Sequence, residues 1–169
     1  MIEIILTQGK TTLIDDIDND LANLKWRARV SKRISSESWY AIRQSSRTDG
    51  KRKTIHLHRI ILERKLGRSL NSNECVDHIN NYSLDNSRKN VRLATQSENN
   101  QNSRARKGLK SSQYKGVYWF KSANKWVSQL YLKGRHVHLG LFDDEQDAAK
   151  AYNLAARSYF GDFAKLNKI

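Results

Sequence analysis

The chain has 169 residues, of which 38% are hydrophobic, and 31 Lys and Arg residues against 17 Asp and Glu residues give it a formal net charge of +14. A chain of this length forms one ordinary domain or two or three very small ones, and the low hydrophobic content argues against one large core. So large a positive charge favours a polyanionic partner, most often a nucleic acid, over a protein that is merely soluble and cationic.

The only cysteine is Cys75, which excludes an internal disulfide framework and a zinc site built from several thiolates. It weakly favours an intracellular setting. No stretch approaches the roughly 20 apolar residues that a membrane helix needs, and the first ten residues lack the basic and apolar segments of a signal peptide. We therefore expect a soluble protein that is not exported and has no membrane partner.

The N-terminal part has a side-chain pattern that is typical of short strands. Residues 1–14 alternate apolar and polar side chains around Gly9, which predicts a hairpin. The acidic segment 15–26 then predicts a brief helix, with carboxylates that are structural because a helix N-terminus favours negative charge. A small antiparallel sheet with a basic face is expected from three further runs: 26–31, 38–44 and 53–59. An amphipathic helix follows over 58–67 and ends at Gly67.

The segment 99–113 is predicted to be a linker. It holds no acid and four basic residues, Arg104, Arg106, Lys107 and Lys110. Composition alone leaves open whether it is a passive tether or an arm that follows DNA, but a passive tether does not need one-sided charge.

Strand periodicity returns in the C-terminal part, in the runs 114–120, 125–132 and 135–142. A helix is expected next, opening with Asp143 and Gln146 at capping-box spacing and closing at Gly161. Its packed stripe is predicted at i, i+4, i+7 and i+11, on Ala148, Tyr152, Ala155 and Tyr159. A three-stranded sheet backed by one helix is a complete small domain.

The polar segment 76–100 has the parts of a one-metal nuclease. If a strand ends at His78 and a second begins at Asn90, a helix from Ser97 can bring Asn99 close to Asp77 and His78. A neutral imidazole is a suitable base for activating water. Carboxylate and amide oxygens are hard ligands that suit Mg²⁺ or Mn²⁺. On composition alone, a solvated loop is the commoner explanation of such a segment.

The spacing of DH (77–78), LDNSRKNVRL (84–93) and SENN (97–100) closely resembles the HNH (ββα-metal) nuclease motif, in particular its His-Asn-Asn form in phage intron-encoded homing endonucleases. The resemblance implies that His78 is the general base, that Asn90 holds the loop, and that Asp77 and Asn99 bind the metal. Because Asn99 stands where many HNH enzymes have a final His, Mg²⁺ or Mn²⁺ is expected rather than zinc or nickel.

Several further residues near the motif need an interpretation, and for the histidines two are open. His56 and His58 lie at strand spacing and could form a metal pair with a third ligand. We prefer His58 and Arg59 as structural or phosphate-contacting residues, because many HNH proteins carry a similar His-Arg pair there. Arg92 is expected to contact DNA. Cys75 is expected to be a small buried residue.

The segment 112–167 resembles the Apetala/ethylene-response-factor (ERF) DNA-binding domain of plant transcription factors, a module also found fused to phage HNH nucleases. The matching residues are Gly116, Leu139, Gly140, Phe142, Ala148, Ala149, Ala151, Tyr152 and Asn167. That family lays its sheet in the major groove of DNA. The resemblance implies contacts to bases or phosphates from Lys115, Tyr118, Phe120, Lys125, Gln129, Tyr131, His136 and His138.

The chain departs from the plant pattern at these positions, because plant domains place several arginines and tryptophans there. The bound sequence therefore cannot be transferred. His136 and His138 could form a metal pair, but they fit better as residues of a sheet face opposite DNA. Trp119 and Trp126 are expected to pack in the core rather than to stack on single strands.

Together these observations predict an α+β fold of small modules. The modules are an N-terminal part (1–55), which loosely resembles leader regions of phage HNH proteins, an HNH core (56–102), a basic linker (103–113) and an ERF-type domain (114–169). The expected function is that of a monomeric, sequence-specific homing endonuclease that cuts double-stranded DNA with Mg²⁺ or Mn²⁺ in the cytoplasm of a phage-infected bacterial cell. The alternatives are a catalytically silent DNA-binding regulator that keeps the HNH fold and a nonspecific nuclease of the bacteriocin type.

Overall fold

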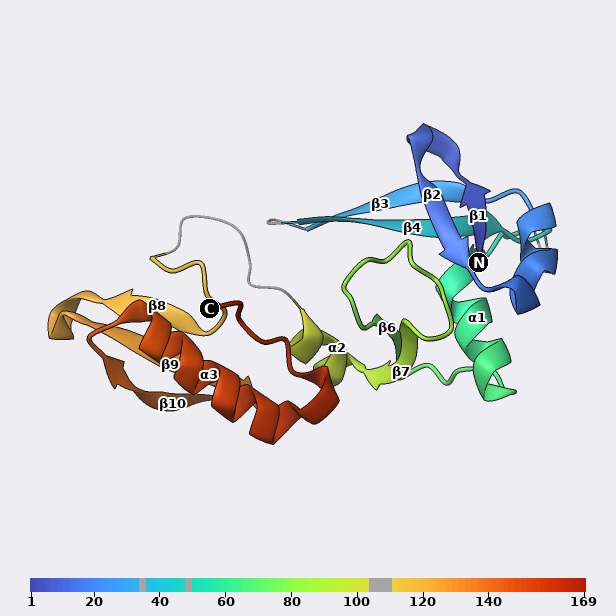
Figure 1. The fold of residues 1–169 in the computed structure, drawn as a ribbon. Helices are drawn as coiled ribbons and strands as arrows, with labels where there is room; N and C mark the ends of the chain where they lie inside the picture. The colour runs from blue at the N-terminus through green and yellow to red at the C-terminus, as the bar shows by residue number, and fades with distance from the viewer. Residues whose placement is uncertain (34–35, 48–49, 104–110) are drawn as a thin grey trace. The chain divides into compact units, whose positions relative to one another are not determined.

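A computed structural model of the chain describes residues 1–33, 36–47, 50–103 and 111–169. It divides into two compact units, Met1–Asn99 and Asn100–Ile169. Both units combine helices with small antiparallel sheets (Figure 1), so the expected α+β fold class is confirmed. The four basic linker residues Arg104, Arg106, Lys107 and Lys110 lie outside the described residues.

The first unit begins with the predicted hairpin, formed by β1 (Ile2–Ile5) and β2 (Thr11–Ile14). The acidic segment that follows is a 3-10 helix, η2 (Asp16–Asn23), and not a regular α-helix. Asp18, inside it, has φ −104° and ψ 20°, and its carboxylate is fully buried against Arg64 and Arg88. Asp18 and Asp20 bind arginines from later segments, whereas Asp16 pairs with the N-terminal ammonium, so these acids are structural, as expected.

A three-stranded antiparallel sheet comes next, in the order β3 (Arg27–Arg33), β4 (Ser36–Gln44) and β5 (Thr54–His56). Ala28 and Ala41 lie opposite each other and are both buried. Arg27 and Arg29 alternate with Ala28 along β3, as the strand period requires. The predicted antiparallel sheet is present, but its basic residues do not share one face, because Arg27 lies opposite the buried Ile42 and Arg43 has the parity of Ala41.

The helix α1 (Leu57–Leu66) ends at Gly67, which has the left-handed φ of 69°. It is followed by the antiparallel pair β6 (Glu74–His78) and β7 (Val91–Thr95), and then by α2 (Gln96–Asn102). The core of the first unit draws on the hairpin, on η2, on the sheet and on α1 and β7 together. Its buried members are Ile4, Leu6, Ile14, Leu21, Trp26, Ala28, Ala41, Leu57, Ile61, Leu84 and Val91. Residues of 1–55 and of 56–102 thus share one core.

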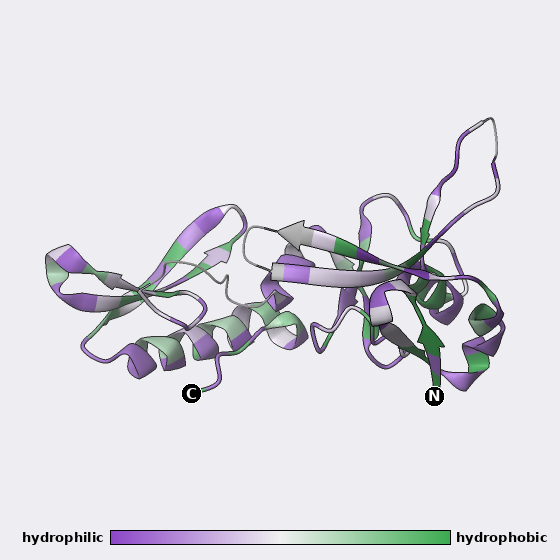
Figure 2. Ribbon diagram, turned by 90° about the horizontal axis from the view of Figure 1, so that it is seen from above, coloured by the Kyte–Doolittle hydropathy of each residue, from purple (hydrophilic) through white to green (hydrophobic). Residues whose placement is uncertain are grey.

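The second unit contains a sheet in the order β10 (Arg135–Phe142), β9 (Lys125–Leu132) and β8 (Val117–Phe120), with α3 (Glu145–Phe160) packed on it. In Figure 2 hydrophilic and hydrophobic residues alternate along these elements, as expected where one side of each is packed. No described helix is long and apolar enough to cross a membrane.

Two details of α3 differ from the sequence prediction. Its N-cap is Asp144, whose side chain accepts hydrogen bonds from the backbone of Gln146 and Asp147, because Asp143 is bound to Lys125 at 2.6 Å instead. The buried stripe continues through Ala156 and Phe160, at steps of four residues, while Tyr159 is 56% exposed.

Candidate active site

The candidate catalytic residues lie on two strands, the loop between them and the helix that follows. Asp77 and His78 are the last two residues of β6, and they lie opposite Arg92 and Val91 of β7. The start of α2 is held by a capping box, in which Glu98 Oε2 accepts from Thr95 N at 2.7 Å and Glu98 N donates to Thr95 Oγ1 at 3.2 Å. This box fixes the first turn of α2, which carries Asn99.

Asn90 joins the two ends of the loop between β6 and β7. Its Oδ1 accepts from Asn80 N at 3.0 Å, and its Nδ2 donates to the Asp85 carbonyl at 2.7 Å. Its backbone carbonyl also accepts from Ile79 N at 2.9 Å. Three hydrogen bonds from one residue therefore set where β6 ends and, with it, where His78 lies.

The same loop is docked on the N-terminal hairpin. Leu13 N donates to the Leu84 carbonyl at 2.9 Å, and Asn86 N donates to the Leu13 carbonyl at 2.9 Å. Leu84 and Asn86 are 2% and 1% exposed. The middle of this polar segment is thus packed against β2 and is not a solvated loop.

His78 is 8% exposed, and its Nε2 lies 3.1 Å from Asn86 Oδ1. Burial lowers the pKa of His78 below its usual value, although the hydrogen bond to Asn86 and the charges of Asp77 and Asp85 oppose this shift. The imidazole is therefore neutral near pH 7, which is the form that can accept a proton from water.

Asp77 is 2% exposed, and its Oδ2 pairs with Arg92 Nε at 2.8 Å. The ion pair gives this buried carboxylate a hydrogen-bond partner and orients it. Arg92, which the sequence assigns to DNA, thus has a structural contact with the candidate metal ligand; its contact with DNA stays a prediction.

Asp77 and Asn99 supply one carboxylate and one amide, whose oxygens fit a hard ion such as Mg²⁺ or Mn²⁺. Among the residues that the structure describes, no group of three or more His, Cys, Asp and Glu side chains is arranged to hold a metal. The alternative of a histidine metal site at His56 and His58 therefore has no third ligand of these types in the described chain.

Four rings form a continuous cluster beside the site. His58 stacks on His56 at 5.1 Å between ring centroids and meets Tyr40 and His78 edge to face at 5.5 and 5.4 Å. Burial holds the pKa of His58 well below its usual value and also lowers the pKa of His56. His58 thus packs directly on the candidate base, while Arg59 donates to the Leu70 carbonyl at 2.7 Å.

A model of the HNH endonuclease family matches residues 56–101. The HNH endonuclease L560 of Acanthamoeba polyphaga mimivirus is 32% identical over 136 residues, which make up 80% of this chain and 70% of that protein. This chain belongs to the HNH endonuclease family.

This HNH family member also shares a shorter segment with plant proteins. The AP2-like ethylene-responsive transcription factor TOE2 of Arabidopsis thaliana is 41% identical over 58 residues, 34% of this chain and 12% of the plant protein. APETALA2-like protein 2 of Oryza sativa subsp. indica is 40% identical over 58 residues, 13% of its own length. The chain thus spans a small part of each plant relative.

The second unit of this HNH family member has one sheet face that α3 leaves open. Leu130 and Val137 are opposite each other and pack toward α3, so the next pair, Tyr131 and His136, lies on the other face. The same alternation places seven of the eight predicted contact residues on this open face: Tyr118, Phe120, Lys125, Gln129, Tyr131, His136 and His138.

Lys115, the eighth, lies before β8 and not on this face. Its ammonium donates to the carbonyls of Gln101 and Ser103. Burial, with a smaller effect of the charge on Lys165, lowers the pKa of Lys115 to about 8. Its contact with DNA stays a prediction.

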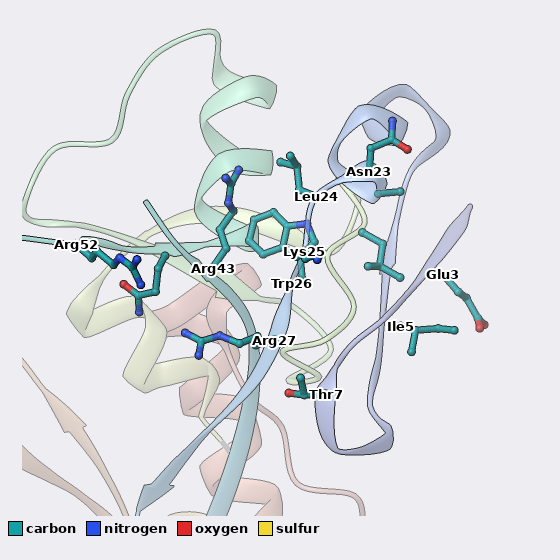
Figure 3. Close-up of a pocket in the computed structure, with 13 residues that line it drawn as sticks. Glu3, Ile5, Thr7, Asn23, Leu24, Lys25, Trp26, Arg27, Arg43 and Arg52 are labelled. Carbon is teal, nitrogen blue, oxygen red and sulfur yellow. The ribbon is translucent and has the colours of Figure 1, made fainter. Parts of the chain in front are cut away.

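A hollow of about 1030 Å³ opens in the first unit of this family member, beside β1 and the start of β3 (Figure 3). Figure 3 shows Arg27, Arg43 and Arg52 on one side of it and Glu3 on the other. None of the candidate catalytic residues lines it. Its positive charge matches a polyanion rather than a neutral small molecule.

Sequence reasoning missed two buried polar residues of the site, Thr12 and Asn86, which are 0% and 1% exposed. One local signal could have pointed to Thr12, because it stands on the same parity of β2 as the buried Ile14. No local signal marks Asn86, whose partners lie in other segments.

Proposed function

We propose that the chain is a sequence-specific DNA endonuclease of the HNH homing type, which hydrolyses phosphodiester bonds in double-stranded DNA with one divalent metal ion. The observation that supports it most directly is the buried Asp77-His78 pair at the end of β6, with His78 kept neutral by burial. Membership of the HNH endonuclease family supports the same reaction class.

In this proposal β6, β7 and α2 form the ββα-metal arrangement. Asp77 and Asn99 hold Mg²⁺ or Mn²⁺, which supplies positive charge to the phosphate oxygens. His78 accepts the proton of the attacking water. Asn90 holds the loop, and the Arg92 guanidinium orients the Asp77 carboxylate.

DNA binding is shared among several surfaces in this proposal. The open face of the β8–β9–β10 sheet reads sequence in the major groove, in line with the partial similarity to AP2-like transcription factors. The basic linker 103–113 follows the phosphates between the core and the ERF-type domain. Monomeric action in a phage-infected bacterial cell belongs to the same proposal.

The reaction is tested by incubating the protein with DNA of its own locus and with unrelated DNA, each with Mg²⁺ or with EDTA. We expect cutting of the first DNA alone and only with Mg²⁺. Absence of metal-dependent cutting in both would favour the silent DNA-binding regulator. Equal cutting of both would favour a nonspecific nuclease.

His78→Ala tests the role of the base separately. We expect a loss of cleavage rate of about 100-fold or more, because a general base contributes at least that much. DNA affinity, measured by gel shift without metal, should stay within about twofold, since the substitution removes no phosphate contact. A parallel loss of affinity would show that His78 maintains the DNA-binding surface instead.

A further inference from the structure

A chain of three buried hydrogen bonds links the N-terminal hairpin to the candidate base. Thr12 Oγ1 lies 2.7 Å from the Leu84 carbonyl oxygen, and Asn86 Nδ2 lies 2.7 Å from Thr12 Oγ1. Asn86 Oδ1 then lies 3.1 Å from His78 Nε2. Thr12 and Asn86 are 0% and 1% exposed, so protein groups, not bulk water, satisfy these atoms.

The Leu84 carbonyl, at one end of this series of hydrogen bonds, determines which atom donates in each of them. A carbonyl oxygen only accepts, so the single Thr12 hydroxyl proton lies between Thr12 and Leu84. The Thr12 oxygen then offers only lone pairs to Asn86, and the Asn86 NH₂ group donates to it. The Asn86 oxygen is left facing His78, and its contact at 3.1 Å requires a hydrogen on Nε2.

We propose that Thr12 is a positioning residue which, through Asn86, holds neutral His78 as the tautomer with hydrogen on Nε2. The lone pair is then on Nδ1, which is the atom that accepts the proton of the attacking water. The catalytic part of this inference rests on the proposed nuclease function, whereas the tautomer itself does not.

Backbone hydrogen bonds hold the residues of this hydrogen-bond series in place. Leu84 O also accepts from Leu13 N at 2.9 Å, and Leu13 O accepts from Asn86 N at 2.9 Å. Turning the Asn86 amide over would place its NH₂ group against His78 and its oxygen against the Thr12 oxygen, with the Thr12 proton already committed to Leu84. The opposite tautomer therefore requires two buried contacts to change together.

The inference extends the active site beyond the segment that matches the HNH family, which begins at residue 56. Thr12 belongs to β2, so the N-terminal hairpin supplies a part of the site rather than only a support for it. The segment that matches the family includes Asn86, but it does not include Thr12, whose hydroxyl orients the Asn86 amide.

The test is ¹⁵N NMR of the histidine rings in the full chain, without metal or DNA, at a pH of about 7.5, above the ordinary imidazole pKa. His78 is assigned by comparison with His78→Ala. We expect a protonated Nε2 and an unprotonated Nδ1 in the wild-type protein and in Thr12→Ser, which keeps the hydroxyl. Thr12→Val should give a mixture of the two tautomers, because neither orientation of the Asn86 amide is then preferred by residue 12.

Cleavage rates give a second readout. We expect kcat to fall roughly tenfold in Thr12→Val with KM for DNA unchanged, and to recover in Thr12→Ser, because partners that orient an active-site group typically contribute that much. Thr11→Val is the matched control, since Thr11 is the exposed neighbour on the same strand. It should change neither the spectrum nor the rate.

A wild-type spectrum with hydrogen on Nδ1 would overturn the tautomer. An unchanged tautomer in folded Thr12→Val, or in Thr12→Ala should the valine variant not fold, would overturn the role of Thr12. Because the spectra need neither metal nor DNA, these results are independent of whether the chain cuts DNA. A protein that shows the expected tautomers but cuts no DNA would leave the positioning contact standing and remove only its catalytic use.

Discussion

His56, His58 and His78 are imidazoles whose pKa values burial lowers below their usual range. The folded state therefore binds fewer protons than the unfolded chain at mildly acidic pH. The contribution of these three histidines to the free energy of unfolding is fully present above the unfolded imidazole pKa of about 6.5. It is lost as the pH falls from there through the lower pKa values of the folded state. The first unit should thus be most stable at neutral pH or above.

We expect the free energy of unfolding to fall as the pH is lowered from about 7 to about 5, and to fall less steeply in His58→Phe, which removes the most strongly shifted group. Urea unfolding at a series of pH values, followed by fluorescence of Trp26 and Trp39, measures this. His136→Asn, an exposed histidine of the second unit, serves as the control. An equal slope in wild type and His58→Phe would mean that His58 takes up its proton over the same pH range in the folded and unfolded states, so that folding does not lower its pKa.

Asp18 is a second residue whose substitution is expected to have a large effect on stability. Its fully buried carboxylate binds Arg88 at 2.8 Å and Arg64 at 3.2 Å, and the hydrogen bond from Arg88 is the main cause of its lowered pKa. Asp18→Asn should cost about 3 kcal/mol of stability, because it leaves two arginines beside a buried neutral group. Asp16→Asn, whose side chain is 79% exposed, should cost less than about 0.5 kcal/mol in the same thermal unfolding experiment.

The helices and strands could largely be predicted wherever a local hydrophobic period determines them. The hairpin, both three-stranded sheets, α1 and α3 follow from alternation or helical spacing together with glycines at the ends. The sequence did not reveal η2 as a 3-10 helix, since its carboxylates are fixed by arginines far along the chain. The contact between Thr12 and Asn86, 74 residues apart, was hidden for the same reason.

Gly116 tests how the elements of the second unit meet. It has φ of 78°, and a Cβ there would lie 2.2 Å from the Tyr152 ring and 2.4 Å from the Gln129 carbonyl. Gly116→Ala should therefore cost about 3 kcal/mol or more, since both backbone strain and a clash with α3 oppose it. Gly134 has φ of 83° with nothing within 4 Å, so Gly134→Ala should cost only about 1 kcal/mol. Equal losses of stability in the two variants, measured by calorimetry, would show that the cost comes from the backbone conformation alone and not from a clash.

For the whole molecule, the formal net charge of +14 is the property that most directly favours a polyanionic partner. Truncation after Asn102 removes the linker and the β8–β9–β10 sheet. We expect weaker DNA binding and a shallower dependence of log affinity on log salt, because each lost phosphate contact lowers that slope by about one. Titrations at several salt concentrations measure it, and an unchanged slope would show that the removed part does not touch DNA.

The hydrogen bond between Asn86 and Thr12 also has a consequence in time. The two residues are 74 positions apart, so β2 leaves the ribosome well before the loop that docks on it. At about 5 to 20 residues per second, the interval is roughly 4 to 15 seconds. During this interval a nascent chain holds β2 without the loop, so the site around His78 is completed late in the synthesis of the first unit.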